Sequence, residues 1–401
     1  MLVTGIVAVA VTGALVTAVL ARPAHISLSA NSGRSHHTHH SRGVFGGTTT
    51  RALAFSTLDN ATDPTFNQLL GINNRNLIAG YFGSGAAGHP NKGYLLNLSR
   101  ATSTFMNENF PGSVQTQVTG LNDRGVTVGF WSDMNNANEM NKNVGFYSIG
   151  RRFHNVGFPT MNNAMPPVNQ LLGVNNHNVA VGFYVDAKGN SHGYTYSIAR
   201  QRFHTVKVRH ATSVTAAAID NWGDIAGFFT NAAGQTDGFV LNGGRMVKLA
   251  FRGASMTQAF GVNDHGEVVG TYTVGTGDNA MTHGFTWTRR HGFKTVDDPM
   301  GMGTTTINGV NNAGFLVGFY NDAAGNTHGF VQARGKFIAM TTAATPTMTA
   351  APTMTAAPTM SPTPTMSGAM TATPTMTATP TAPATATPTQ APVPTGSPTH
   401  W

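Results

Sequence analysis

Acidic residues and possible nucleophiles are the side chains of this sequence that could carry out catalysis, and the acids are few and scattered. The 401 residues include 16 acids, whose only clusters are Asp297-Asp298 and the stretch from Asp133 to Glu139. Both clusters lie where turns are expected, and neither a G-x-S-x-G elbow nor an H-E-x-x-H motif occurs. The pattern predicts no catalytic residue, although a pair assembled from distant segments would leave no signal in the sequence.

Histidines form two groups with metal-binding potential. Three occupy one recurring position, His192, His283 and His328, which elsewhere holds Lys92, Val144 and Asp237. To bind zinc, the three side chains would have to converge within roughly 2 Å of one ion. Because the same position accepts Lys, Val or Asp in the other units, we expect these histidines to be structural or to face solvent. The tract His36 to His40 could bind a transition metal weakly. We predict no metal in the folded domain and no cofactor.

The charge pattern argues against nucleic acid as a partner. The formal net charge is +8, but the densest basic clusters are only Arg151-Arg152 and Arg289-Arg290, too short for a nucleic-acid footprint. A long-range attraction to anionic glycans or lipid surfaces fits better. The chain has no cysteine, so a large core has to hold the fold without disulfides.

The ends of the chain differ in composition from its middle. Residues 1–21 are apolar or small, and Val19-Leu20-Ala21 offers a signal-peptidase site, but the usual basic n-region is missing. A cleaved signal peptide and a retained N-terminal anchor both remain open. Residues 22–53 form a Ser/Gly/His-rich linker, and residues 341–401 form a Thr/Pro/Ala/Met tail. We expect an exported protein, extracellular or on the cell surface, with a disordered or extended tail that carries O-glycans in one reading.

Residues 54–340 contain six copies of one repeat. The core of each copy begins at Gly71, Gly120, Gly173, Ala218, Gly261 and Gly309. Each core is followed by a Gly-aromatic pair: Gly93-Tyr94, Gly145-Phe146, Gly193-Tyr194, Gly238-Phe239, Gly284-Phe285 and Gly329-Phe330. A third mark follows about ten residues later, usually Phe. Repeats of this length are typical of solenoids and propellers.

Each unit reads as four short strands. In the fifth unit these are Gln258 to Val262, Glu267 to Tyr272, the strand that begins at Gly284, and Phe293 to Val296. Asn, Asp and Gly between the first two favour a tight turn. The fold class is therefore all-β, a six-bladed β-propeller of four-stranded antiparallel blades. A glycine recurs in each second strand, as at Gly129 and Gly270, and indicates close approach of a neighbouring blade.

These units resemble the HAF repeat, a probable extracellular repeat of bacteria. Gly261 to Gly270 with His283-Gly284-Phe285 is the closest copy, and Gly309 to Gly318 with His328-Gly329-Phe330 is nearly as close. The second motif has Gly throughout where the family name has Ala, and its His is present in only three units. The resemblance implies export and a propeller-like fold but no catalytic residues. The integrin-type FG-GAP blade is a competing likeness, but these turns lack the carboxylates of its calcium loop.

Two sets of residues are candidates for ligand binding. Position three of the core is always Asn or Asp: Asn73, Asn122, Asn175, Asp220, Asn263 and Asn311. Uniformity across six units favours turn formation over a ring of ligand contacts, since a site usually breaks symmetry. The longest spacing between cores surrounds two loops of the second and third units, so these loops supply the candidate binding residues Trp131, Asp133, Asn135, Met161 and Asn163.

Three functions remain open on the sequence alone. The first is a non-catalytic surface module, acting as a monomer, that binds a glycan or protein and contacts a membrane only through an uncleaved N-terminal segment. The second is an extracellular hydrolase or lyase with its site at the channel. The third is a structural or adhesive surface component.

One prediction concerns how the ring closes. Phe55 to Asp59 precedes the first core and matches Phe293 to Asp297 position for position. Propellers commonly complete one blade with strands from both chain ends, which removes the exposed edge. We therefore expect residues 54–58 to pair with Gly329 to Gln332, and residues 337–340 to lie beside that strand or fray.

Overall fold

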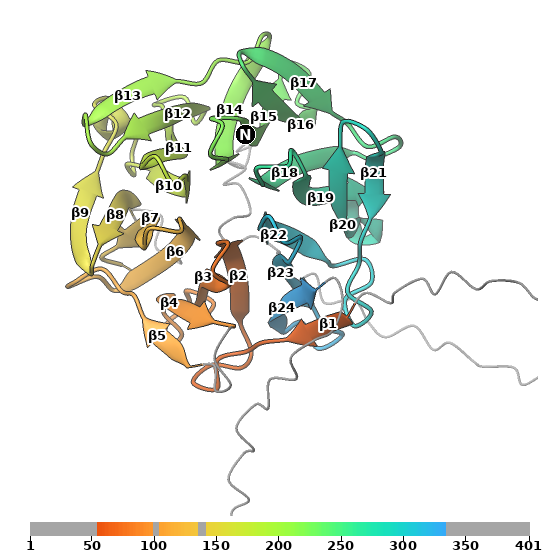
Figure 1. Cartoon of the computed structure of the whole chain (residues 1–401), viewed down its shortest axis with the longest axis horizontal. Helices are drawn as coiled ribbons and strands as arrows, with labels where there is room; N and C mark the ends of the chain where they lie inside the picture. The colour runs from red at the N-terminus through yellow and green to blue at the C-terminus, as the bar shows by residue number, and fades with distance from the viewer. Residues whose placement is uncertain (1–53, 99–103, 135–141, 334–401) are drawn as a thin grey trace, which may run out of the picture. The chain divides into compact units, whose positions relative to one another are not determined.

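A computed structural model describes residues 54–98, 104–134 and 142–333, and these residues form a closed ring of six blades around a central channel (Figure 1). In each blade we call the strands a to d from the innermost outward. Four blades are separate four-stranded sheets, and the other two are joined into one eight-stranded sheet by a single parallel pair, Thr236 with Met256. The predicted fold class is confirmed.

The first three blades follow one another along the chain. Blade one contains β2 (Asn67–Ile72), β3 (Leu77–Phe82), β4 (Lys92–Asn97) and β5 (Phe105–Asn107). Blade two contains β6 (Gln115–Leu121), β7 (Val126–Ser132), β8 (Val144–Ile149) and β9 (Arg152–Val156). Blade three contains β10 (Asn169–Val174), β11 (Val179–Val185), β12 (Ser191–Ser197) and β13 (Arg202–Thr205), and the short 3-10 turn η1 (Met161–Asn163) precedes it.

The remaining blades repeat the order, except that the last takes its outer strand from the N-terminal side. Blade four contains β14 (Ala211–Ile219), β15 (Ile225–Asn231), β16 (Thr236–Asn242) and β17 (Arg245–Leu249). Blade five contains β18 (Met256–Val262), β19 (Val268–Val274), β20 (Met281–Thr288) and β21 (Gly292–Thr295), with the 3-10 turn η2 (Gly277–Asn279) before β20. Blade six contains β22 (Thr306–Val310), β23 (Leu316–Asn321), β24 (Thr327–Ala333) and β1 (Ala54–Thr57).

The predicted ring closure is confirmed. β1 runs antiparallel to β24, with Phe55 opposite Gln332 and Thr57 opposite Phe330. The backbone N–H of Leu58 donates to the carbonyl of Gly329 at 2.8 Å. Pairing the two ends of the domain removes a free sheet edge, which would otherwise invite aggregation. Residues 337–340 lie outside the described residues, as do the signal, linker and tail segments.

Apolar side chains pack between neighbouring blades. One core cluster joins Val128 and Tyr147 of blade two to Leu171 and Tyr194 of blade three. A similar cluster joins blade six to blade one and includes Leu58. Alternation along each strand sends one set of side chains into each interface, as period-two patterning requires. Burial between blades therefore holds the ring together without cysteine.

The recurring strand-b glycines are tightly packed, but the prediction of their neighbour was wrong. A Cβ on Gly129 would lie 2.0 Å from the carbonyl oxygen of Gln117 and 3.0 Å from the ring of Phe146. Both neighbours belong to the same blade, where strand a shifts register between Val118 and Gly120. The contact with the next blade occurs at the strand-a glycine instead, since a Cβ on Gly120 would lie 3.0 Å from the Cα of Gly173.

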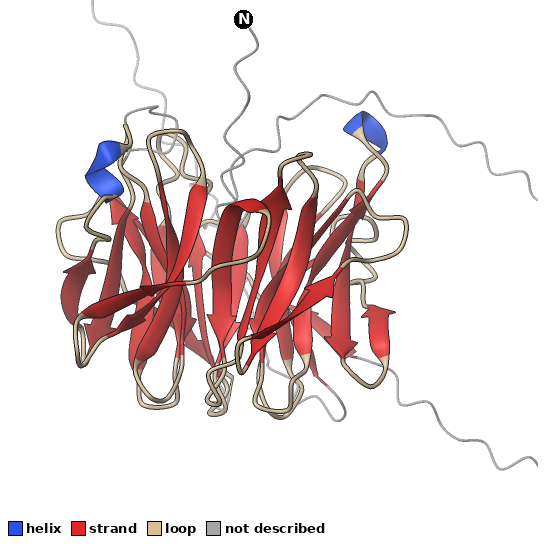
Figure 2. Cartoon of the chain, turned by 90° about the horizontal axis from the view of Figure 1, so that it is seen from above, coloured by secondary structure: helices blue, strands red, loops and turns tan. Residues whose placement is uncertain are grey.

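The ring has two unlike faces (Figure 2). Strand direction puts the a–b and c–d connections on one face, which we call the turn face, and the b–c and d–a connections on the other, which we call the loop face. The turn face has short, tight connections, and the loop face carries η1 and η2. Among the described residues, no helix has the length and apolar character needed to cross a membrane.

Candidate binding site at the channel mouth

The position-three residues form the a–b turns, as the sequence predicted. In all six blades the Oδ1 atom of this residue accepts hydrogen bonds from the backbone N–H groups two and four positions later, at 2.8–3.1 Å. Asn and Asp make this turn because their short side chains replace a missing backbone partner. The turn chemistry is therefore the same in every blade.

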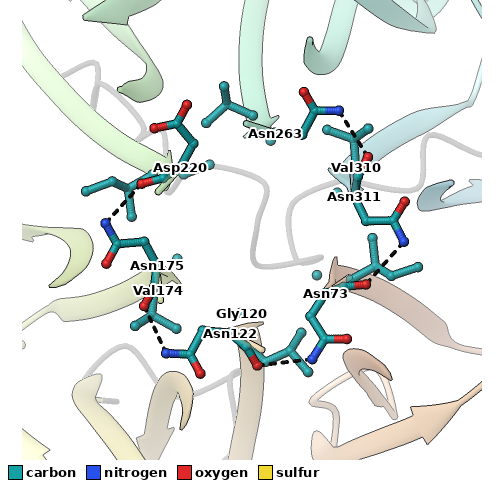
Figure 3. A pocket seen from close by; sticks show the side chains of 18 of the residues that line it. Asn73, Gly120, Asn122, Val174, Asn175, Asp220, Asn263, Val310 and Asn311 are labelled. Carbon is teal, nitrogen blue, oxygen red and sulfur yellow. Dashed lines mark hydrogen bonds between the residues drawn. The ribbon is translucent and has the colours of Figure 1, made fainter. Parts of the chain in front are cut away.

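The same side chains also join the blades to one another. In five blades the Nδ2 atom donates to the backbone carbonyl of position three in the next blade, at 2.9–3.1 Å. These bonds run around the mouth of the channel (Figure 3). The last of them, from Asn311 to Asn73, connects the sixth blade to the first. We call this set the position-three ring.

The position-three ring is interrupted at Asp220 in blade four. Asp220 is 4% exposed, and its Oδ2 atom has no hydrogen-bond partner among the described residues. A carboxylate cannot donate as the five asparagines do, so the bond toward Asn263 is missing in Figure 3. Burial raises the pKa of Asp220 to about 6, and the nearby carboxylate of Asp224 adds to the effect.

A second ring of hydrogen bonds lies at the tips of the turns and is complete. Its members are the position-four residues Asn74, Asp123, Asn176, Asn221, Asp264 and Asn312. In every blade the backbone N–H of this residue donates to Oδ1 of the next member, at 2.8–3.0 Å. We call it the position-four ring.

Two opposed aspartates organise the position-four ring. Oδ2 of Asp123 accepts from the amides of Asn74 at 3.0 Å and Asn176 at 2.8 Å. Oδ2 of Asp264 accepts in the same way from Asn221 at 2.9 Å and Asn312 at 2.7 Å. Burial opposes ionisation of Asp264, but these hydrogen bonds outweigh it and lower the pKa of this carboxyl. Asp264 is thus held as a charged acceptor.

The two rings surround a polar cavity of about 120 Å³ that opens on the turn face. Its walls are the position-three and position-four residues of all six blades. A second, smaller cavity of about 20 Å³ adjoins it, and both are lined by Leu70, Thr119, Leu172, Ala217, Phe260 and Asn308. The mouth therefore presents carbonyl, amide and carboxylate groups to molecules that approach the turn face.

Trp222 is the exception among the residues around this mouth. Position five of the core is exposed in every blade and holds Arg75, Arg124, His177, Trp222, His265 and Ala313. Trp222 is 79% exposed, and its indole Nε1 donates to the carbonyl of Asp264 at 3.1 Å. That bond and the turn at Asp220 tie the ring of Trp222 between blades four and five. A large aromatic surface held in solvent at a cavity rim is a common feature of binding sites.

Asp220, Trp222 and the position-four ring were not predicted as a site. A signal did exist, since the fourth core reads Ala-Ile-Asp-Asn-Trp where the others begin with Gly and have Asn at position three. The departure gathers three unusual residues in one turn. What the sequence could not show was that position five is exposed and that the turns meet at one mouth.

The described members of the candidate set Trp131, Asp133, Asn135, Met161 and Asn163 lie toward the loop face, at the end of β7, in the b–c connection of blade two, and in the connection from blade two to blade three. Trp131 stacks on Phe110 with ring centroids 4.7 Å apart, and its Nε1 donates to Oδ1 of Asn155 at 2.8 Å. Asp133 pairs with Lys142 at 2.8 Å. Met161 and Asn163 belong to η1, and Asn135 lies outside the described residues. The binding role predicted for these five residues stays a prediction.

The three recurring histidines are paired with carboxylates on the loop face. Nδ1 of His283 lies 2.7 Å from Asp297, and Nε2 of His192 lies 2.8 Å from Asp186. His328 sits between two acids, with Nδ1 2.6 Å from Asp59 and Nε2 3.1 Å from Asp322. Within residues 54–98, 104–134 and 142–333, no group of three His, Asp or Glu side chains could hold a metal ion. The tract His36 to His40 lies outside these ranges.

Comparisons with known proteins support the fold alone. No family model matches the chain, and no curated protein matches it either. Among solved structures, the chain is similar to the Aleuria aurantia lectin bound to a fucose-containing disaccharide, with a TM-score of 0.40, 10% identity, and coverage of 70% of this chain and 98% of that one.

The chain is also similar to two other solved structures. TolB from Acinetobacter baumannii has a TM-score of 0.39 and 10% identity, covering 65% of this chain and 64% of that one. An ulvan lyase bound to a glucuronate–sulfated rhamnose unit has a TM-score of 0.36 and 11% identity, covering 68% of this chain and 79% of that one.

Proposed function

We propose that this chain is an exported, non-catalytic binding module of the HAF-repeat type, whose turn face holds a glycan at the channel mouth. The observation that carries the proposal is Trp222, which is 79% exposed beside a polar cavity. It belongs to the one blade whose turn departs from the other five. A binding site that uses one blade of a repeat would produce this break in symmetry.

The chemistry of the mouth suits a sugar. A sugar ring presents apolar C–H groups on its faces and hydroxyl groups on its edges, so an aromatic ring beside hydrogen-bonding groups is complementary to it. Trp222 supplies the aromatic face. Asn221, Asp264 and His265 lie next to it on blades four and five and supply donors and acceptors. The apolar N-terminal segment and the resemblance to an extracellular repeat support export.

Turnover is less well supported than binding. The carboxylates of Asp123 and Asp264 each accept hydrogen bonds from two asparagine amides, and these bonds connect blades. In Asp220, Oδ1 accepts the backbone N–H groups of its turn, and Oδ2 is buried without a hydrogen-bond partner among the described residues. The carboxylates of Asp123 and Asp264 therefore serve the ring, and either would have to be released from these bonds to act as a catalytic acid or base.

A glycan array with matched variants tests the proposal. The full secreted chain is compared with Trp222→Ala and with Met302→Ala, because Met302 is 77% exposed on the loop face. We expect the wild type and Met302→Ala to bind the same glycans, and Trp222→Ala to lose about tenfold or more in affinity, as buried aromatic anchors do. Equal binding by all three proteins, or shortening of a bound glycan, would contradict the proposal.

A further inference from the structure

The basic residues of the described chain are divided between the two faces by type. Nine arginines lie in a–b turns, in c–d turns or at the first residue of strand d: Arg75, Arg124, Arg151, Arg152, Arg200, Arg202, Arg245, Arg289 and Arg290. The six described lysines lie on the loop-face side: Lys92, Lys142, Lys188, Lys207, Lys248 and Lys294. Arg209 and Arg252 are the only described arginines on that side.

The turn-face arginines are available to a partner. All nine are exposed, and none makes an ion pair with any residue in the described ranges. On the loop face, by contrast, Lys142 pairs with Asp133 at 2.8 Å and Lys248 with Asp237 at 2.7 Å. The lysine charges are thus partly neutralised in place, whereas the arginine charges face solvent.

Seven of the arginines follow the outer edge of the turn face, at the c–d turns of blades two to five, and we call them the arginine rim: Arg151, Arg152, Arg200, Arg202, Arg245, Arg289 and Arg290. The mouth at the centre of the same face carries both signs of charge, since Asp123 and Asp264 line it and Arg75 and Arg124 are exposed beside it. An extended anion is therefore attracted most strongly to the rim. The exposed ring of Trp222 lies inside the rim, on blade four.

The choice of arginine points to oxyanions with fixed geometry. A guanidinium donates two parallel hydrogen bonds to a carboxylate, sulfate or phosphate, whereas an ammonium acts as a point charge. A lipid surface would be served equally well by lysine, and a flat bilayer pressed on this face would also meet the carboxylates of Asp123 and Asp264. A linear chain can instead lie along the arginines of the rim.

We infer that the turn face binds an acidic polysaccharide, a carboxylated or sulfated chain whose oxyanions lie along the arginine rim while one sugar ring contacts Trp222. The inference rests on the proposed function and names the class of glycan. Each guanidinium binds one oxyanion and displaces its counterions, so affinity falls as salt rises.

The test uses three variants of the full secreted chain. The rim variant carries Arg→Gln at positions 151, 152, 200 and 202. The control carries Gln at positions 188, 207, 209 and 294 on the loop face. It therefore removes an equal number of positive charges, four, also from exposed side chains. The third variant carries Arg→Lys at the four rim positions. Polygalacturonate, dextran sulfate, neutral dextran and phosphatidylglycerol vesicles serve as probes at several salt concentrations.

We expect binding to polygalacturonate or dextran sulfate but not to neutral dextran. The rim variant should lose about tenfold or more in affinity, together with part of the salt dependence, and the control should lose less than about twofold. The Arg→Lys variant should fall between them, because it keeps charge without the two-pronged geometry.

Other results overturn the inference and separate it from the proposed function. Equal losses in the rim and control variants would mean that net charge alone drives binding. Trp222-dependent binding to neutral glycans, with no affinity for the acidic ones, would remove the inference and leave the proposed function standing. Rim-dependent binding to vesicles without binding to any glycan would remove both.

Discussion

On the turn face, asparagine and aspartate side chains form two rings of hydrogen bonds that run from blade to blade. On the loop face, aspartates bind histidines within one blade, and in blade six Asp59 binds His328. Asn175 and Asp186 of blade three illustrate the contrast. Both accept two backbone N–H groups in a tight turn, but Asn175 also donates to Asp220 of the next blade, and Asp186 binds His192 of its own blade. These two turns therefore differ in their partners, since Asn175 binds the next blade and Asp186 binds its own.

This division has a consequence for where a ligand can bind. On the turn face the backbone is held by two rings of hydrogen bonds, so the exposed position-five side chains are presented from a rigid base. A rigid base lowers the entropy cost of binding. The loop face has longer connections and exposed methionines, among them Met165, Met300 and Met302.

The largest effect should come from removing the outer strand that completes blade six. Deletion through residue 59 removes β1, the buried side chain of Leu58 and the Asp59–His328 contact. Lost burial and an open sheet edge should cost about 4 kcal/mol or more, and lower the melting temperature by about 10 °C. Calorimetry and light scattering measure both. A truncated protein that stays monomeric with an unchanged melting temperature would show that β1 does not close the ring.

The matched pair in blade three comes next in size. Asn175→Ala loses three hydrogen bonds at a residue that is 5% exposed, and should cost about 3 kcal/mol of unfolding free energy. Asp186→Ala loses similar turn bonds in a more exposed site, and should cost about 1 kcal/mol. Chemical denaturation of both variants gives the comparison. Equal losses would mean that the bond between blades contributes nothing.

The position-three ring can also be completed by substitution. At neutral pH Asp220 is a buried carboxylate without a donor for the next blade, and Asp220→Asn should supply one and stabilise the fold by about 1–2 kcal/mol. The pKa of Asp220 in the folded protein, about 6, lies above its ordinary value of 3.8. Its stabilising contribution is therefore present below pH 4 and is lost as pH rises through 6.

Melting curves at two pH values test the interpretation of Asp220. Asp220→Asn should melt several degrees above the wild type at pH 7.5 and close to it at pH 4.5, where the wild-type carboxyl is protonated and can itself donate. A variant that is less stable than the wild type at pH 7.5 would show that the carboxylate has a partner of its own.

A smaller pH effect of related origin is expected on the loop face at His328. Burial opposes its charge, but hydrogen bonds to Asp59 and Asp322 outweigh burial and raise the pKa of His328. Its contribution is present below about pH 6.5 and is lost as pH rises through the raised folded value. His328→Gln should cost about 0.5–1 kcal/mol at pH 6 and less at pH 9. A cost that is the same at both pH values would argue against a charged imidazole.

The smallest effect should follow metal removal. The turn face is held by asparagine amides and the loop face by His–Asp pairs, so the repeat domain should fold without calcium or zinc. Adding EDTA should change the melting temperature by less than about 1 °C. A drop of many degrees would mean that an ion holds one of the faces.

Repeat spacing predicted the ring, but contacts between repeats could not be predicted. The six cores predicted the strand order because strands within a blade pair with their sequence neighbours. The spare copy at Phe55 to Asp59 predicted the closure because it matches the outer strand of the fifth unit. The prediction for Gly129 was wrong because a recurring strand glycine is equally compatible with close packing inside its own blade and with close packing against the next blade. The position-four ring joins residues about 50 apart, such as Asn74 and Asp123, and only a closed ring brings them together.

The position of the candidate site could not be predicted from the sequence either. The sequence indicated the loops around Trp131 and Met161 as candidate sites because the spacing between repeats shows that they are long. Trp222 sits in a turn of ordinary length, and its exposure depends on the direction in which position five points from the finished ring. The departure of Asp220 and Trp222 from the repeat pattern was a more informative sequence signal than loop length.

The central claim is that the turn face, not the loop face, holds the ligand, and nuclear magnetic resonance of one sample tests it directly. The protein is labelled with ¹⁵N in the tryptophan indoles and ¹³C in the methionine methyls, and the tightest glycan from the array is added unlabelled. Trp222 reports on the turn face, and Met165, Met300 and Met302, all more than 70% exposed, report on the loop face. We predict that the indole signal of Trp222 shifts while these methyl signals stay in place. Shifts of the methyl signals with an unchanged Trp222 signal would contradict the account.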